Sequence, residues 1–204
     1  MDLLFLITYG LVHNIMMHDH MVNFTKEQLI DGRDYMENCT LKSDAAWKLN
    51  RILIFPLMPA DALLNLRCSA RPIYDECVNS LNNRMRVNLN ATQINALNYW
   101  RKIDSDILDH SCDKIEMFKN MTQEGTACSR SSNKALKDCS VHLTSLDNVG
   151  FYDIPEFQQR CSDFEKFETC MKISFAKICP PNVNEYIGGI IRAILSNICP
   201  KNVV

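Results

Sequence analysis

Ten cysteines are the residues with the clearest capacity for chemistry in this chain of 204 residues. An even number of cysteines at this density is typical of a disulfide framework in a secreted protein. Zinc sites, the alternative, usually contain cysteine pairs only about two to four residues apart. The shortest interval between cysteines here is nine positions, and the five histidines do not cluster with them. We therefore expect five disulfides, and no metal ion or other cofactor.

The regular cysteine spacing near the C-terminus predicts one of these disulfides. Cys161, Cys170 and Cys179 recur every nine residues, which turns an α-helix by about 900°, so neighbouring thiols point to opposite sides. Pro180-Pro181 then breaks the helix, and a second helix leads to Cys199. Cys161 lies nineteen residues before Pro180 and Cys199 nineteen after it, so the two thiols should meet at the open end of an antiparallel helix pair.

Apolar residues at helical spacing support both helices of this pair. The first stripe contains Phe164, Phe167, Met171, Phe175 and Ile178. The second stripe contains Val183, Tyr186, Ile187, Ile190, Ile191, Ile194, Leu195 and Ile198. Gly188-Gly189 lies inside the second stripe, which indicates close packing of the backbone there.

Capping residues, apolar periodicity and prolines predict helices in the rest of the chain. Pro72 is expected in the first turn of a new helix, because proline disrupts a helix interior. Few alternating runs and only six glycines argue against strands, so the predicted class is all-α. The expected helices run from Thr25 to about Cys39, from Ser43 towards Pro56, from Asp61 through Cys68, onward from Pro72, from Asn90 to Gly125, and around Leu136 and Cys139.

The N-terminus predicts a signal peptide over residues 1–20. The apolar run from Leu3 to Val12 is too short to span a membrane and suits the core of a secretion signal. Asp2 replaces the usual basic residue and no A-x-A site follows, so an incomplete or alternative N-terminus stays open. His18-Asp19-His20 has a metal-binding spacing, but such a motif near a terminus is usually solvated. We expect an extracellular protein.

Two stretches of the chain share a motif and its spacing. Arg67-Cys68-Ser69 followed by Cys77 matches Arg160-Cys161-Ser162 followed by Cys170. On this register Cys39 corresponds to Cys139, and Cys112 to Cys199. The repeat predicts two related helical halves, residues 22–119 and 120–204, packed as one compact protein and closed by disulfides. It also predicts a Cys68–Cys112 disulfide as the counterpart of Cys161–Cys199.

Composition and motifs argue against several classes of function. A net charge of −2, with 47% hydrophobic and 23% charged residues, indicates a globular protein with no nucleic-acid or membrane partner. The sequence contains no G-x-S-x-G, H-E-x-x-H or phosphate-binding glycine loop, so we expect no enzyme. The acidic pairs Asp104/Asp106 and Glu165/Glu168 are expected on solvated helix faces. The sequence leaves open a catalytic Ser/His/Asp triad, because the members of a triad come together only in the folded protein.

Four sequons could carry N-linked glycans, at Asn23, Asn38, Asn90 and Asn120. Asn90 and Asn120 flank ends of expected helices, and we predict glycosylation there first. Asn38 stands beside Cys39 and is expected to be less accessible.

The cysteine pattern contains Arg71-Pro72 inside C-x8-C, then Cys112-Asp113, Cys128, Cys139, the C-x8-C-x8-C run and the isoleucine-rich helix ending at Ile198-Cys199. This pattern resembles that of the 27 kDa haemolymph glycoprotein family of insects. The resemblance covers roughly Phe24 to Cys199 and implies a secreted, helical, disulfide-bonded glycoprotein of body fluid with no established biochemical activity.

This chain lacks two cysteines of that family pattern, one upstream of Cys39 and one near Val87 or Asn88. On the repeat they would be the counterparts of Cys128 and Cys179. Because a lone thiol would be reactive, their joint absence implies that Cys128 pairs with Cys179. Cys139 then remains for Cys170, and the repeat assigns Cys39 to Cys77.

Three classes of function remain for such a protein. The first is a non-catalytic haemolymph or secretory glycoprotein that acts through its surface. The second is an extracellular carrier of an apolar small molecule in a helix-lined cavity. The third is a hydrolase or an inhibitor, which no motif supports. The partner is unknown, with an apolar small molecule or another extracellular protein as the candidates.

Overall fold

The computed structural model describes residues 26–52, 60–122, 127–146, 149 and 153–199. In these ranges every regular element is helical, which confirms the all-α class. The elements are α2 (Lys26–Thr40), α3 (Asp44–Ile52), α4 (Ala60–Met85), the 3-10 helix η3 (Arg86–Asn88), α5 (Ala91–Asp113), α6 (Ile115–Thr122), α7 (Ala127–Cys139), the 3-10 helix η4 (Ser140–Leu146), α8 (Ile154–Gln159), α9 (Cys161–Ala176) and α10 (Pro181–Ile198).

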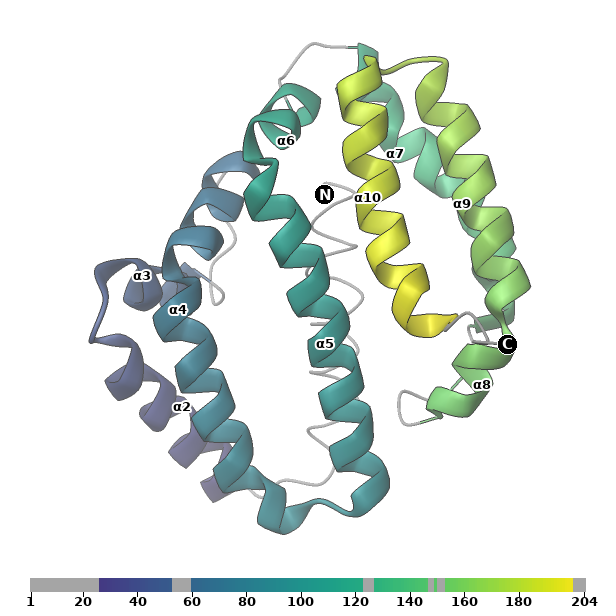
Figure 1. Cartoon of the computed structure of the whole chain (residues 1–204). Helices are drawn as coiled ribbons and strands as arrows, with labels where there is room; N and C mark the ends of the chain where they lie inside the picture. Colours follow the sequence, from purple (N-terminus) through teal and green to yellow (C-terminus); the bar gives the residue numbers. More distant parts are fainter. Residues whose placement is uncertain (1–25, 53–59, 123–126, 147–148, 150–152, 200–204) are drawn as a thin grey trace.

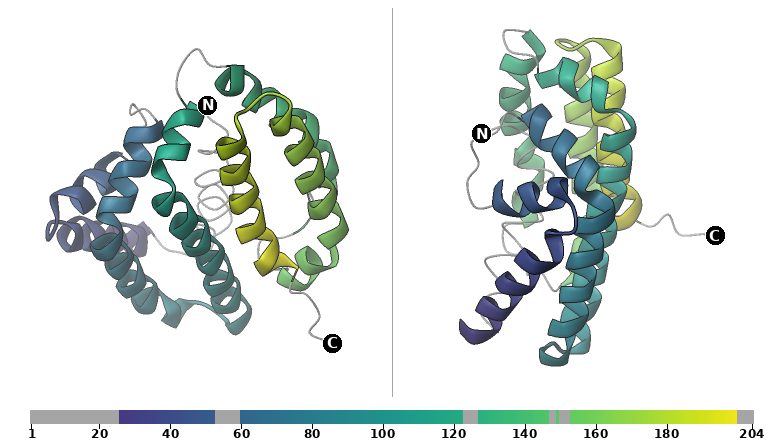
Figure 2. Two further views of the ribbon diagram at one scale, coloured as in Figure 1. Left: turned by 45° about the horizontal axis from the view of Figure 1, so that its top comes forward. Right: turned by 90° about the vertical axis from the view of Figure 1, so that its left-hand side faces the viewer.

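The helices are arranged in two groups that meet between α5 and α10 (Figure 1). α2 and α3 lie against α4, and α5 follows α4. On the other side α7, α8 and α9 accompany α10. α5 and α10 run antiparallel and side by side, and Figure 2 shows the same two groups from other directions. In the described part of the chain, no helix has the length and hydropathy needed to cross a membrane.

The prediction that Pro72 begins a helix is wrong, because α4 continues through it from Ala60 to Met85. Proline removes one backbone hydrogen bond inside a helix. Ion pairs along one helix face span the defect. Asp75 accepts from Arg67 Nη1 at 2.9 Å and lies 3.4 Å from Arg71 Nε. These ion pairs therefore join the helical turns before and after Pro72.

The predicted long helix starting after Asn90 is two helices. Its start is confirmed, because Asn90 and Gln93 form a capping box with both hydrogen bonds at 2.9 Å. α5 then ends at Asp113, and the Lys114 carbonyl accepts the first backbone bonds of α6. Beyond this break Phe118 is buried, with its ring 6.0 Å from that of Tyr186. The expected breaker Gly125 lies outside the described residues.

The main hydrophobic core contains residues from both groups of helices. Trp100 of α5 lies at its centre, 1% exposed, and meets the Phe157 ring edge-on at 5.0 Å. Two smaller clusters hold α3 and α2 against α4. Trp47 of α3 is only half-buried, with the Arg51 guanidinium 5.2 Å from its ring centroid. The α2–α3 end of the molecule is therefore packed separately from the main core.

The two C-terminal stripes form core faces as predicted, with one exception. Phe164, Phe167, Met171 and Phe175 are buried, but Ile178 is 38% exposed because α9 ends at Ala176, before it. In α10 the buried residues are Val183, Tyr186, Ile187, Gly188, Gly189, Ile190, Ile191 and Ile198. Ile194 and Leu195 are partly buried against the same core.

Candidate functional site

The ten cysteines form five disulfides, and their pairs are the ones that the sequence analysis predicts. Their Cα–Cα distances lie between 4.7 and 5.8 Å, inside the normal range for a disulfide. No cysteine is free. The pairs are Cys39–Cys77, Cys68–Cys112, Cys128–Cys179, Cys139–Cys170 and Cys161–Cys199.

The disulfides connect helices in the same way in both groups of helices. Cys39–Cys77 joins α2 to α4 as Cys139–Cys170 joins α7 to α9. The other equivalent pairs, Cys68–Cys112 and Cys161–Cys199, join α4 to α5 and α9 to α10. Each of the five disulfides lies within one predicted half. The division into residues 22–119 and 120–204 itself stays a prediction, and its boundary falls inside α6.

The four sequons differ in how their residues are placed. Asn90 is exposed and uses its side-chain oxygen to cap α5, whereas a glycan would attach to the side-chain nitrogen. Asn38 is also exposed, in α2, although Cys39 and Thr40 of the same sequon are buried. Asn120 belongs to α6, and Asn23 and the His18-Asp19-His20 motif lie outside the described residues.

The described residues bring one dense set of charges together, between α4 and α5. This α4–α5 charge cluster contains Arg67, Arg71 and Asp75 of α4 with Asp104 and Asp109 of α5. Arg67 Nη2 lies 3.6 Å from Asp104 Oδ2, and Arg71 pairs with Asp109. Arg71 also donates to the Ser105 hydroxyl at 3.0 Å. Both arginines therefore link α4 to α5 at the level of Pro72.

Sequence analysis missed this cluster, although Arg67, Arg71 and Asp75 recur every four residues. That spacing places them on one face of a helix, but only if the helix continues through Pro72. The expectation that Asp104 lies on a solvated face is also wrong. Its side chain is only 28% exposed, because it faces Arg67 across the contact between α4 and α5.

Burial sets the acid–base properties of the cluster and its neighbours. It raises the pKa of Asp104, against the opposing effect of Arg67. It also raises the pKa of Tyr74 to about 12, and Arg67 lies 4.8 Å above the Tyr74 ring. The pKa of Arg71 is raised, chiefly by its hydrogen bond to Asp109. Each aspartate of the cluster is paired with one or both of the arginines, so the arrangement fits a structural clamp between two helices.

The expected acidic pairs do not form paired carboxylate sites. Asp104 faces Arg67, whereas Asp106 accepts from Lys102 at 2.8 Å and from Asn197 at 2.7 Å. Glu165 is exposed as expected. The expectation of a solvated face is wrong for Glu168, whose side chain is only 17% exposed and is paired with Lys172 on the same helix. Among the residues with described positions, no group of three His, Cys, Asp or Glu side chains could hold a metal ion.

Asp104→Asn is expected to raise the free energy of unfolding at neutral pH. The pKa of Asp104 is higher in the folded protein than in the unfolded chain, so ionisation of this carboxyl destabilises the fold. Asparagine carries no charge, so the gain should shrink as the pH falls through the pKa of Asp104. Urea unfolding at about pH 7 and about pH 4 measures the difference.

Asp106→Asn is the matched control for this prediction. Burial alone would raise the pKa of Asp106, but hydrogen bonds from Lys102 and Asn197 outweigh it, and the pKa is lowered. Asp106 therefore stabilises the fold above its unfolded pKa, and its loss should lower stability at neutral pH. A lower stability of Asp104→Asn at about pH 7 would show that the Arg67 ion pair outweighs burial.

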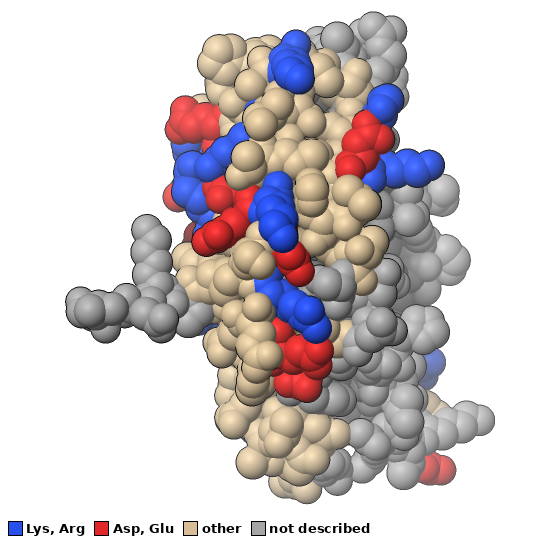
Figure 3. All heavy atoms as spheres, turned by 90° about the vertical axis from the view of Figure 1, so that its right-hand side faces the viewer, with Lys and Arg blue, Asp and Glu red and all other residues tan. Residues whose placement is uncertain are grey.

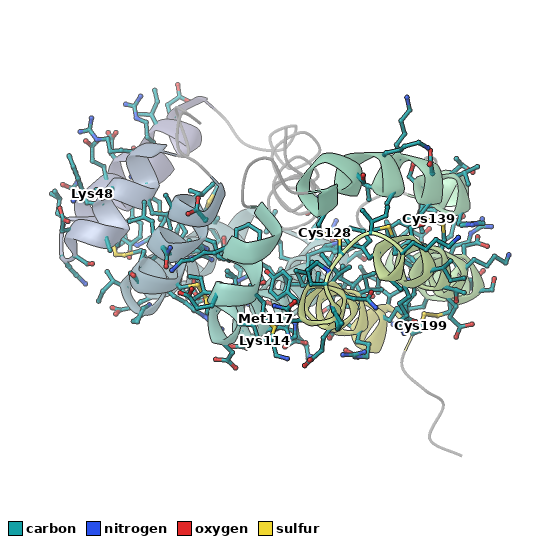
Figure 4. All side chains as sticks on the ribbon, turned by 90° about the horizontal axis from the view of Figure 1, so that it is seen from above. Lys48, Lys114, Met117, Cys128, Cys139 and Cys199 are labelled. Carbon is teal, nitrogen blue, oxygen red and sulfur yellow. A yellow bond between two sulfur atoms is a disulfide. The ribbon has the colours of Figure 1, made fainter. Side chains whose placement is uncertain are left out.

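Basic and acidic side chains are interspersed on the face that contains α7 and α9 (Figure 3). Pairs one helical turn apart account for part of this pattern, such as Lys172 with Glu168 and Lys166 with Asp163. Figure 4 views the molecule from the end where α6 meets α10 and labels Lys114. There Lys114, just after α5, forms an ion pair with Glu185 of α10.

The contact between α5 and α10, called the α5–α10 interface below, combines apolar and polar groups. His110 Nε2 lies 3.0 Å from the Tyr186 carbonyl oxygen and donates to it, while the two rings stack at 5.5 Å. The Tyr186 hydroxyl donates to Ser111 at 3.1 Å, and burial raises the pKa of Tyr186. The His110 ring lies directly over Gly189, where a Cβ atom would be 2.0 Å from it. The close backbone packing predicted at Gly188-Gly189 is therefore present at Gly189.

Fold and cysteine pairing together define a disulfide-rich, all-helical protein whose described residues form a structural charge cluster. A family model described as a protein of unknown function, DUF1397, matches residues 52–199, and the chain belongs to this family. The match includes every cysteine except Cys39. No curated protein and no solved structure matches the chain.

Proposed function

We propose that the chain is a secreted, non-catalytic glycoprotein of insect body fluid, which acts through its surface. The observation that carries this proposal is the pairing of all ten cysteines, because structural disulfides form and persist in oxidising compartments. The resemblance of the cysteine pattern to insect haemolymph glycoproteins supports two parts of the proposal, the location in body fluid and the insect source. The α4–α5 charge cluster, in which every aspartate is paired with an arginine, supports a role without catalysis.

Expression of the chain from its own N-terminus in insect cells tests the proposal. The protein should appear in the medium without free thiols, and its N-terminal sequence should begin between Leu11 and Phe24. Intact Met1 in protein from the medium would overturn the predicted signal peptide. A fully reduced protein retained in the cells would overturn secretion itself.

Asn90 is predicted to carry a glycan in protein recovered from the medium. Thr92→Ala removes the sequon but leaves the capping box of Asn90 and Gln93 intact, so it should lower the apparent mass without loss of stability. Asn90→Asp is a second test, because aspartate caps a helix as well as asparagine does. Gel mobility before and after endoglycosidase treatment measures the mass of the glycan. Equal mobility of the parent protein and both variants would contradict glycosylation of Asn90.

Carriage of an apolar molecule is the alternative that the same material can test. A fluorescent fatty probe titrated into the purified protein should remain unbound up to about tens of micromolar if the protein acts through its surface. Saturable binding at lower concentration would instead assign the protein to the carriers.

A further inference from the structure

Helices α5 and α10 occupy equivalent positions in the two halves, and their sequences match as well. Aligning Cys112 with Cys199, the equivalent disulfide partners, shifts α5 onto α10 by 87 positions. On this register several residues are identical, including buried or partly buried ones. The identical pairs are Asn95 and Asn182, Tyr99 and Tyr186, Ile103 and Ile190, Ile107 and Ile194, and Leu108 and Leu195.

Contacts across the α5–α10 interface are reciprocal on the same register. His110 contacts Tyr186, and the equivalents of these two residues are Asn197 and Tyr99. Tyr99 does donate to the Asn197 carbonyl oxygen, at 3.3 Å. Reciprocal contact of this kind is the property of an isologous interface between two copies of one surface. The two halves thus meet as two subunits of a symmetric dimer would.

The two faces are equivalent in position but complementary in size. Lys102 and His110 of α5 are equivalent to Gly189 and Asn197 of α10. Lys102 Nζ donates to Asn197 Oδ1 at 2.7 Å, and His110 lies over Gly189. Large side chains of α5 therefore fit against smaller residues of α10, whereas α5 against α5 would oppose large residues. The interface therefore favours pairing of half 1 with half 2 over pairing of two identical halves.

All five disulfides lie within the halves, so the α5–α10 interface is closed by non-covalent contacts. Each half keeps its own disulfides when this interface opens. A single segment of the chain connects the two halves. An opened half can close again on its own partner half or on that of a second molecule. We propose that two copies of the chain exchange halves, with α5 of each copy packed on α10 of the other.

The ion pair of Lys114 with Glu185 allows a direct test, because the two residues belong to different halves. Protein labelled with nitrogen-15 is mixed with unlabelled protein at high concentration and treated with a zero-length carbodiimide. This reagent joins an amine to a carboxylate only where they touch. Exchange should yield Lys114–Glu185 peptide pairs with one labelled and one unlabelled member, together with covalent dimers on a denaturing gel.

Two variants of the full chain make the outcome decisive. Glu185→Gln should abolish this peptide pair, which identifies the pair in the parent protein. In the parent protein, mixed pairs at other positions without mixed Lys114–Glu185 pairs would contradict exchange. Gly189→Ala, which forces His110 aside, should speed the appearance of mixed pairs about tenfold or more. Peptide pairs of a single isotope only, in both the parent protein and Gly189→Ala, would overturn the proposal.

Discussion

Gly189→Ala is expected to lower the free energy of unfolding by about 1–3 kcal/mol, the usual cost of overpacking a core. A Cβ atom at this position would lie 2.0 Å from Cε1 and 2.1 Å from Nε2 of His110. His110 has little room to yield, because it is bonded to the Tyr186 carbonyl and stacked on the Tyr186 ring. The loss should exceed the gain of about 1 kcal/mol that alanine brings to a helix. Urea unfolding with the disulfides intact measures the balance.

Gly188→Ala is the control for this prediction. Its Cβ atom would meet only the ends of two flexible side chains, Arg192 at 3.4 Å and Lys172 at 3.9 Å. This variant should be as stable as the parent protein, or more stable through helix propensity. When His110 is already replaced by alanine, Gly189→Ala should cost little or no stability, because the clashing ring is gone. Equal stability of the two single alanine variants would show that His110 does not pack on Gly189.

Replacing Cys39 and Cys77 together by alanine is expected to release α2 from α4. Loss of a native disulfide typically costs about 2–5 kcal/mol. The buried cluster at this contact is small, with Met36 and the two cysteines themselves as its buried members. Amides of α2 should therefore lose hydrogen-exchange protection by about this free energy, while amides of α5 and α10 keep theirs.

The pair Cys139 and Cys170 provides the comparison, because it joins α7 to α9 as Cys39–Cys77 joins α2 to α4. These cysteines belong to the main core, with Cys139 fully buried. Their replacement by alanine should lower the global free energy of unfolding and affect α5 and α10 as well. A uniform loss of protection after replacement of Cys39 and Cys77 would contradict the separate packing of α2.

Helix geometry and the internal repeat predicted two of the five disulfides, whereas the other three were implied by the resemblance of the cysteine pattern to insect haemolymph glycoproteins. Two helices joined by a tight proline turn place equidistant residues side by side, which assigns Cys161 to Cys199. The repeat then carries this assignment to Cys68 and Cys112. The apolar stripe of α9 was predictable for the same reason, except at Ile178, where the helix has already ended.

Features that depend on contacts between helices were not predictable from local pattern. Pro72 signals a helix start by itself, and the ion pairs that span it become visible only when Arg67 and Asp75 are placed on one continuous helix. Asp104 shows the same dependence, since its burial arises from α4 and not from its own helix. The break at Lys114 also went unpredicted, and beyond it the Phe118 ring lies near the Tyr186 ring of α10.

The separate packing of α3 and of the main core gives the protein two built-in optical reporters. The chain has two tryptophans. Trp100 is 1% exposed among aromatic side chains, whereas Trp47 is half-buried beneath Arg51. Indole fluorescence shifts to shorter wavelengths in apolar surroundings, so the two emissions should differ in colour. Wavelength-resolved fluorescence during unfolding can thus follow α3 through Trp47 and the main core through Trp100, in the natural sequence and without added dyes.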